Sequence, residues 1–445
     1  MISVKKLPTN VGPAGWNEMI PPQATPKICD AAYKTDFAVI GGGYAGIAAA
    51  RRLAQLEPNA KIIVLEAQRI GQGPAGRNSG FMIDLPHVLS SHNYGSGLEA
   101  DKLQIQMNRE AIQFALEAKD QLKLPDHVIA QDGKTNAAIT EKAYEQNVGF
   151  QNHLKALGEA SEQLDAQQMR EMTGSSFYTS GLYTPGTVMV QPAAYIRALA
   201  DNLPDHVTVY EASPVVSMER QGSNWLLKTP EGQVSAGRVI LATNGHAQSF
   251  GFYKQRFVHL ILYASLSRLL TQDEICLMGG QSRWGVTPSD PMGSSVRRVD
   301  SPDGVRILMR NSASYEPSKV GDVSKVAKLA NRHRHSISKR WPKLENLELE
   351  YSWGGNLCLS RNDAQAFGEV DTNLISACCQ NGLGTSRGTF AGMMAAELAL
   401  GNTDNVMLNE LLKQPMPSKI PPEPFASIGA KSIMAYKQWK ARSEL

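Results

Sequence analysis

The sequence is short of the features that mark secreted, metal-binding and membrane-spanning proteins. Its 445 residues include five cysteines, an odd number without a CxxC spacing, which argues against a disulfide framework or a zinc site and favours a reducing compartment. No stretch approaches about 18 consecutive apolar residues, the length that a membrane-spanning helix needs. Lys5 and Lys6 are not followed by an apolar segment, as a secretory signal would require. We therefore expect a cytoplasmic protein without stable membrane insertion.

An excess of charge of one sign is also missing. Lysine and arginine number 45 against 42 aspartates and glutamates, so the net charge is only +3. A nucleic-acid-binding protein normally has a denser basic excess, and nucleic acid is therefore not an expected partner. Of the nine histidines, His333 and His335 lie close together, but in a basic segment without an acidic cluster. No metal site is expected.

What the chain does have is a repeated α/β texture. Apolar runs at residues 37–40 and 62–65 are typical of buried strands, and the apolar residues between them have helical spacing. A strand, a helix and a second strand within about 30 residues form the parallel crossover unit. The same texture returns at 186–250 and again from 374 onward. Residues 251–350 alternate enough to predict an antiparallel sheet instead.

These textures predict an α/β fold of several parts. The expected parts are an N-terminal arm (1–34), a discontinuous dinucleotide-binding domain (35–100, 186–250 and 351–402), a mostly antiparallel β substrate domain (101–185 and 251–350) and a C-terminal tail (403–445). The tail alternates apolar residues with lysines, which predicts an amphipathic helix. Such a helix packs on the body or contacts a membrane surface or a quinone-chain partner.

The strongest motif is the GxGxxG turn Gly41–Gly46, which lies between the first predicted strand and helix. Gly41 permits the tight turn, Gly43 lets a pyrophosphate approach the backbone, and Gly46 lets the helix pack closely on the strand. Glu66 follows 20 residues later, at the end of the second strand, where a carboxylate accepts hydrogen bonds from ribose hydroxyls. An adenine dinucleotide is therefore expected, although this motif does not distinguish FAD from NAD.

Three further segments favour a ligand that extends beyond the first phosphates. They are the glycine-rich loop at 71–80, the small residues that end the strand at 239–242, and a late glycine loop at 382–386 that opens a helix of small residues. The amino terminus of that helix would stabilise the negative charge of a reduced flavin. The predicted cofactor-binding residues are Gly41, Gly43, Tyr44, Ala45, Gly46, Glu66, Ala75, Gly76, Arg77, Asn78, Ser79, Gly80, Val215, Thr243, Asn244, Gly245, Gly382, Leu383, Gly384, Thr385 and Ser386.

The order of these motifs, with the run Trp353-Gly354-Gly355, resembles the D-amino-acid oxidase (DAO) superfamily of flavoproteins, and most of all its gamma-glutamylputrescine oxidoreductase branch. The resemblance covers nearly the whole chain from Trp16. It implies a Rossmann-like FAD-binding domain of the glutathione-reductase type, beside a mostly antiparallel β substrate domain. Cys358 does not align with the cysteine that tethers flavin in sarcosine oxidases, so the resemblance implies non-covalent FAD.

The resemblance also implies the reaction. Hydride leaves the carbon beside a neutral amine for flavin N5, and the imine is then hydrolysed, without a strict need for a side-chain base. The substrate is expected to be a small primary or secondary amine, either an N-substituted amino acid or a polyamine derivative. The electron acceptor would be oxygen, or a quinone or other electron-transfer partner. Two alternatives stay open: a D-amino-acid or 2-hydroxy-acid dehydrogenase on the same fold, and an FAD-binding protein that acts as a partner or assembly factor.

Candidates for substrate contact come mainly from the β domain, whose sheet is expected to cover the flavin ring. They are His87, Tyr263, Trp284, Arg310 and Trp353. Arg310 discriminates best between substrates, because a buried arginine facing the flavin would bind a carboxylate or phosphonate bidentately. If Arg310 lay elsewhere, an uncharged or cationic amine would be favoured. No catalytic side chain is identified from the sequence.

Overall fold

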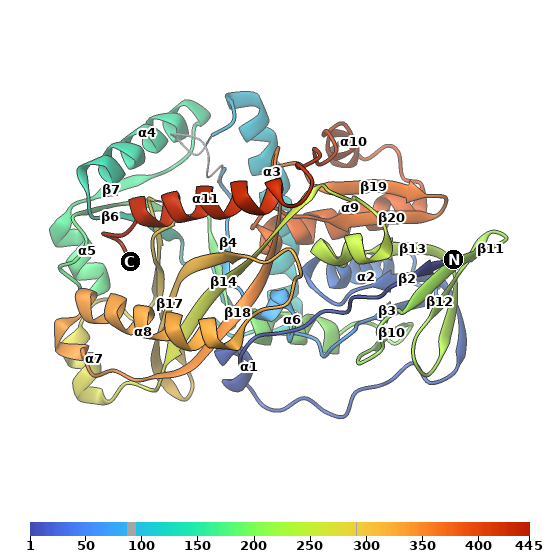
Figure 1. Cartoon of the computed structure of the whole chain (residues 1–445), viewed down its shortest axis with the longest axis horizontal. Helices are drawn as coiled ribbons and strands as arrows, with labels where there is room; N and C mark the ends of the chain where they lie inside the picture. Colours follow the sequence, from blue (N-terminus) through green and yellow to red (C-terminus); the bar gives the residue numbers. More distant parts are fainter. Residues whose placement is uncertain (87–94, 291) are drawn as a thin grey trace.

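The computed structural model describes residues 1–86, 95–290 and 292–445. The candidate His87 lies outside the described residues, so its proximity to the cofactor stays a prediction. Two large sheets dominate the chain and lie side by side, the first on the right of Figure 1 and the second on the left. This α/β arrangement, with one mostly parallel and one mostly antiparallel sheet, confirms the predicted fold class.

The first sheet has a parallel core in the order β10-β3-β2-β13-β20. Its strands are β2 (Ala32–Ile40), β3 (Ile62–Leu65), β10 (Val207–Tyr210), β13 (Gln233–Leu241) and β20 (Leu374–Cys378). Antiparallel strands extend it: β1 (Ile2–Ser3), β11 (Ser217–Gln221) and β12 (Asn224–Lys228) beside β13, and β19 (Ala366–Asp371) beside β20. Every strand that the sequence predicted for this domain is therefore present.

Helices pack on the parallel core and bury their apolar faces against it. They are α2 (Tyr44–Leu56), α3 (Leu98–Leu122), α6 (Pro192–Asp201) and α9 (Thr389–Leu400). The helices α2 and α9 approach backbone to backbone, since a Cβ on Gly392 would lie 2.1 Å from the carbonyl oxygen of Ala45. Small residues on α9 thus hold the late glycine loop against the start of α2.

The second sheet has eight strands in the order β18-β14-β17-β16-β15-β6-β8-β7. They are β6 (Lys134–Ala138), β7 (Glu162–Leu164), β8 (Ser180–Thr184), β14 (Phe257–Ser267), β15 (Trp284–Pro288), β16 (Ser295–Ser301), β17 (Gly304–Tyr315) and β18 (Leu349–Ser360). Because β18 pairs with β14 along its length, residues 351–360 belong to this sheet and not to the dinucleotide-binding domain, where the sequence-based boundary placed them.

The remaining elements cover the second sheet and connect the domains. They are α1 (Gly15–Glu18), α4 (Glu141–Leu157), α5 (Ala166–Thr173), α7 (Gln272–Met278), α8 (Val323–Arg340), the short turns η2 (Asn244–Phe250) and η3 (Pro342–Leu344), and a small sheet of β4 (Phe81–Met82), β9 (Val188–Val190) and β5 (Ile129–Ala130). The helix α8 lies against one face of the second sheet. The opposite face meets the first domain.

The tail folds into α10 (Val406–Leu412) and α11 (Phe425–Lys440). In Figure 1, α11 crosses the top of the second sheet, where Gln438 donates a hydrogen bond to the Ala313 carbonyl of β17. Its side chains Phe425, Tyr436 and Trp439 point outward and are more than half exposed. Among the described residues, no helix combines the length and the apolar character that crossing a membrane requires.

Candidate functional site

The first glycine turn leaves open space beside Gly43, at the amino end of α2. Gly41 has φ +105°, and a Cβ there would lie 2.7 Å from the Ala242 carbonyl oxygen. A Cβ on Gly46 would lie 1.8 Å from the carbonyl oxygen of Gly41. A Cβ on Gly43, in contrast, would meet only Ala75 Cβ, at 3.8 Å. Two glycines are therefore needed for packing, whereas Gly43 keeps space open before the helix.

Glu66 lies beside this turn, at the carboxyl end of β3. Its Oε2 accepts a hydrogen bond of 2.7 Å from the Gly42 amide, and its Oε1 accepts one of 2.8 Å from the Gln68 amide. Burial raises the pKa of Glu66, while these N–H donors act in the opposite direction. The carboxylate is thus fixed at the edge of the turn with acceptor capacity to spare, because each oxygen has two lone pairs.

The second glycine loop contains η1 (Pro74–Gly76) and is ordered by its own side chains. Asn78 donates to the Ala75 carbonyl and accepts from the Gly80 amide, both over 2.8 Å. The guanidinium of Arg77 donates to the backbone carbonyls of Gln72, Gly12 and Gly354. The Arg77 side chain therefore ties the arm, the loop and β18 together, and a contact to the cofactor would come from its backbone.

A buried arginine that the sequence analysis did not single out also holds this loop. Arg297 on β16 donates hydrogen bonds to the carbonyls of Ser79, Gly80 and Val190, and its guanidinium lies over the Phe81 ring. Burial lowers the pKa of Arg297 to about 10. No sequence signal indicated this role, because the partners come from two segments that only the tertiary fold brings beside β16.

The third segment, at the end of β13, packs against the second sheet. A Cβ on Gly245 would lie 2.9 Å from His259 Cε1 and 3.2 Å from Cys358 Cβ. Asn244 accepts a hydrogen bond from the Cys379 amide over 3.1 Å, which places it beside the strand end that leads to the late loop. Thr243 precedes this contact in the chain. Val215 is buried in the same hydrophobic cluster as Leu65, so its side chain belongs to the core of the first domain.

The late glycine loop runs through the turn η4 (Gly384–Gly388) into α9. Thr385 donates to the Phe81 carbonyl over 2.7 Å, and Leu383 packs with Phe81, Ile83 and Met189 in a small apolar cluster. A Cβ on Gly384 would meet nothing within 4 Å, and the Ser386 hydroxyl is buried without a hydrogen-bond partner. The late loop thus has open space beside Gly384 and a buried hydroxyl, that of Ser386, without a hydrogen-bond partner.

Cys358 is a poor candidate for covalent attachment. The residue is 2% exposed, and burial raises the pKa of its thiol, with the neighbouring cysteines acting in the same direction. Because the thiolate is the reactive form of cysteine, Cys358 behaves as a buried apolar residue.

Arg310 lies on the face of the second sheet that meets the first domain. Strand pairing places it opposite Ala264 on β14, and Ala264 lies opposite Trp353 on β18. Ala264 and Trp353 pack with Trp16 of α1 and Ala193 of α6. Since paired residues project from the same face of a sheet, Arg310 points toward the first domain.

The guanidinium of Arg310 is desolvated but unpaired. Burial lowers the pKa of Arg310 to about 10, and no neighbouring charge or hydrogen bond contributes. Among the described residues none forms a hydrogen bond or ion pair with it. Arg310 is half-buried and its guanidinium has no protein partner among the described residues, so this group is available to an anionic ligand.

The other candidates from the β domain have different positions. Tyr263 packs with Ile261 and with Val326 of α8, and Trp284 stacks near Trp341 with ring centroids 5.9 Å apart. Both lie on the α8 face because their strand positions are out of phase with that of Arg310. The structure therefore does not bring Tyr263 and Trp284 together with Arg310. Trp353 is on the correct face, but its indole is fully buried and fastens the second glycine loop.

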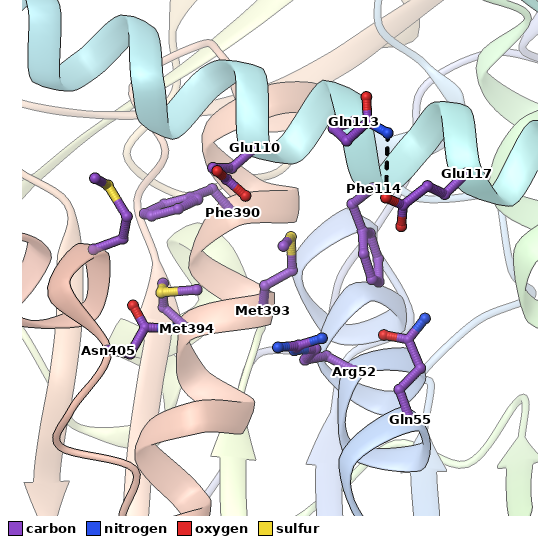
Figure 2. A pocket seen from close by; sticks show the side chains of 11 residues that line it. Arg52, Gln55, Glu110, Gln113, Phe114, Glu117, Phe390, Met393, Met394 and Asn405 are labelled. Carbon is purple, nitrogen blue, oxygen red and sulfur yellow. Dashed lines mark hydrogen bonds between the residues drawn. The ribbon is translucent and has the colours of Figure 1, made fainter.

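A surface groove of about 320 Å³ lies elsewhere, between α2, α3, α9 and α10. Figure 2 shows α3 crossing above it, with Met393, Met394 and Phe390 of α9 forming its apolar floor. Arg52, on its rim, follows Gly43 by nine residues, or about 13 Å along the helix. Arg52 is also paired with Glu397 over 2.6 Å. This groove is therefore separate from the glycine turns.

Comparison with known proteins agrees with this geometry. The family model described as DAO, FAD dependent oxidoreductase, matches residues 36–398. The gamma-glutamylputrescine oxidoreductase of Escherichia coli is 25% identical over 391 residues, which cover 83% of this chain and 84% of that protein. A probable oxidoreductase OrdL of Haemophilus influenzae is 24% identical, with 85% and 86% of the two chains covered. The crystal structure of glycine oxidase from Geobacillus kaustophilus superposes with a TM-score of 0.68 at 18% identity, covering 83% of this chain and 95% of that one. The chain belongs to the DAO family of FAD-dependent oxidoreductases.

Proposed function

We propose that this enzyme oxidises the C–N bond of a small amine that also carries a carboxylate, such as an amino acid or an N-substituted amino acid. The observation that carries this proposal is the desolvated, unpartnered guanidinium of Arg310 on the sheet face that meets the FAD-binding domain. The family supplies the cofactor and the reaction class. Arg310 supplies the selection for an anionic substrate.

The described residues fit FAD on three independent observations. Space is open above Gly43, the carboxylate of Glu66 is fixed beside the turn, and the Ser386 hydroxyl is buried without a partner on the late loop. We infer that the amino end of α2 holds the pyrophosphate, Glu66 holds the ribose, and the loops at 75–80 and 382–386 border the flavin. When bound, FAD accepts a hydride from the carbon beside the amine.

The residues around the flavin position favour a neutral amine. Leu383, Phe81, Ile83 and Met189 form an apolar cluster beside the late loop. Desolvation disfavours the charged form of an amine, so this cluster would lower the pKa of a substrate ammonium placed beside it. Arg310 would meanwhile hold the carboxylate through two parallel hydrogen bonds. Binding and deprotonation of the substrate thus need no general base from the protein.

A panel of matched substrates tests this proposal. The yellow holoenzyme would be mixed without oxygen with γ-aminobutyrate, N-methylglycine and D-alanine, and with butylamine, dimethylamine and ethylamine, which lack the carboxylate. We expect carboxylated amines to bleach the flavin at lower concentration than their counterparts. Bleaching by the uncarboxylated amines alone would refute the role of Arg310. A panel of 2-hydroxy acids tests the second candidate function, which the same guanidinium supports.

The electron acceptor and the cell compartment are also proposals. Peroxide release measured against dye reduction would separate oxygen from a quinone or protein acceptor. The five cysteines are all free in the structure, which supports a reducing, cytoplasmic setting.

A further inference from the structure

A row of polar side chains crosses the second sheet beside Arg310, on the same face. Arg310 of β17 pairs with Ser295 on the neighbouring strand β16. The strand after β16 in the sheet is β15, and its Thr287 pairs with Asn136 of β6. Val286 and Val296, which pair with each other, lie in the core on the α8 side. Their chain neighbours Thr287 and Ser295 must therefore point the opposite way, toward the first domain. We call Asn136, Thr287, Ser295 and Arg310 the polar row.

The polar row faces the same interior as the late glycine loop. Phe81 and Ile83 pack against Leu383, while the Phe81 ring also fills the space above Gly285, where a Cβ would lie 2.6 Å from it. Gly285 precedes Thr287 by two residues and so lies on the same face.

Hydrogen bonds within the row orient one amide. Asn136 Oδ1 accepts from Thr287 Oγ1 over 2.8 Å and also from Lys134 Nζ. Both donors meet the same oxygen, so the amide nitrogen Nδ2 is turned the other way. This Nδ2 is buried and has no hydrogen-bond partner. The same holds for the hydroxyl of Ser295, which is 1% exposed.

The unsatisfied groups of the row are therefore donors. The guanidinium of Arg310 and the amide nitrogen of Asn136 can only donate, and the Ser295 hydroxyl can donate as well. A buried donor without a partner, as at Asn136 and Ser295, is unfavourable, and a ligand with acceptor groups at the right places would satisfy it. Three strand spacings separate the backbones of Arg310 and Asn136, or about 14 Å. One small carboxylate does not satisfy groups that far apart.

We propose that Asn136 forms a second acceptor-binding subsite, whereas Ser295 lies beside Arg310 on the adjacent strand, so that the substrate is an elongated amine with two acceptor groups. One is the carboxylate held by Arg310, and the other is a second carboxylate or an amide carbonyl. This inference rests on the proposed function. Thr287 and Lys134 act as positioning residues, since both donate to Asn136 Oδ1 and orient its amide toward the ligand.

Binding of dead-end ligands tests the subsite without knowledge of the substrate. The holoenzyme would be titrated with succinate, glutarate and adipate, and with butyrate, valerate and hexanoate as monocarboxylates of similar length. Flavin absorbance and calorimetry report the dissociation constants. We expect at least one dicarboxylate to bind about tenfold more tightly than its monocarboxylate counterpart, the effect of one hydrogen bond to a charged group.

Two variants change the free atoms and keep the hydrogen bonds in which they are embedded. Asn136→Asp replaces the free Nδ2 by an oxygen while Oδ1 still accepts from Thr287, and Ser295→Ala removes the unpartnered hydroxyl beside Arg310. Asn136→Asp should abolish the preference for the dicarboxylate, whereas Ser295→Ala should affect monocarboxylates and dicarboxylates alike and keep that preference. Ser314→Ala is the matched control, because Ser314 lies on the other face of β17, bonded to Tyr263. Thermal melting and flavin content establish that each variant is folded.

The outcomes separate this inference from the proposed function. Suppose that Arg310→Met weakens the binding of monocarboxylates, but that dicarboxylates bind no more tightly than monocarboxylates to the natural protein. The second subsite is then refuted and the proposed function stands. A dicarboxylate preference that survives in Asn136→Asp also refutes the subsite. If Arg310→Met leaves monocarboxylate binding unchanged, the proposed function itself is wrong.

Discussion

The indole nitrogen of Trp353 on β18 donates a hydrogen bond of 3.0 Å to the backbone carbonyl of Arg77 in the second glycine loop. The next carbonyl, that of Asn78, accepts from the indole of Trp16 over 2.8 Å. Two buried indoles from distant parts of the chain thus hold consecutive peptide groups. This arrangement fixes the loop that we assign to the flavin against both the N-terminal arm and the second sheet.

Replacement of Trp353 by phenylalanine should therefore weaken both the fold and the cofactor site. The loss of the donor leaves a buried carbonyl unsatisfied, which costs about 1–3 kcal/mol, and it frees the loop. Trp225→Phe is the control, since the Trp225 indole donates over the same 3.0 Å to the Thr372 carbonyl, in the first sheet. Both variants should lower the free energy of unfolding in denaturant titrations. Only Trp353→Phe should raise the FAD dissociation constant, and an equal effect of the two would contradict the assignment of the loop.

Gly43→Ala should impair FAD binding without harm to the apoprotein. A Cβ at Gly43 meets only Ala75, at 3.8 Å, but it would occupy the space where the pyrophosphate approaches the backbone. We expect the FAD dissociation constant to rise at least about tenfold, or about 1.4 kcal/mol, with an unchanged melting temperature of the apoprotein. Gly429→Ala on α11, where a Cβ would meet nothing within 4 Å, controls for the substitution itself. Tight FAD binding by Gly43→Ala would place the cofactor elsewhere.

The affinity for FAD should fall on acidification. Burial raises the pKa of Glu66, and only its carboxylate form accepts hydrogen bonds from two ribose hydroxyls. As the pH falls through this raised pKa, the apoprotein takes up a proton that FAD binding must displace, so the dissociation constant rises. Glu66→Gln should bind FAD more weakly at neutral pH and show a flatter pH profile in fluorescence titrations. Parallel profiles for the two proteins would exclude Glu66 as the group that titrates.

Lys134 should make its own contribution to the pH dependence of stability. Burial lowers the pKa of Lys134 to about 8, although the charge of Asp84 acts in the opposite direction. Between this value and an unfolded pKa of about 10.4, the unfolded chain binds the proton and the folded one does not, so stability falls as the pH drops through this window. The natural protein is compared with Lys134→Met. As the pH drops through this window, the difference between their free energies of unfolding should decline by roughly 3 kcal/mol and then level off. A constant difference would show that Lys134 is charged throughout.

The sequence predicted the cofactor domain well because its signals are local. The turn at Gly41, the strands around it and Glu66 lie within one crossover unit, where spacing alone determines which groups meet. The late loop could be found for the same reason, since a strand, glycines and a helix of small residues follow one another.

The substrate side was harder to predict because it depends on pairing between distant strands. The face on which Tyr263, Trp284 or Arg310 lies follows from register, and a bulge between Leu262 and Tyr263 shifts the register of β14 against β17. Arg297 and the polar row were missed, because their hydrogen-bond partners are distant in the chain: Arg297 bonds to Val190, and Thr287 bonds to Asn136, each over more than a hundred positions. The boundary at residue 351 failed likewise, because β18 belongs to a sheet whose other strands precede it by many residues.

The most direct test of the account is anaerobic reduction of the flavin by γ-aminobutyrate and butylamine in the natural protein and in Arg310→Met. Arg310 is unpaired in the structure, so its removal leaves no carbonyl or carboxylate unsatisfied, and Tyr263→Phe on the opposite face serves as the control. We expect Arg310→Met to raise the apparent dissociation constant for the carboxylated amine by at least about tenfold and to leave that for butylamine unchanged. Equal behaviour of the two amines in both proteins would contradict the role of Arg310 in binding the carboxylate.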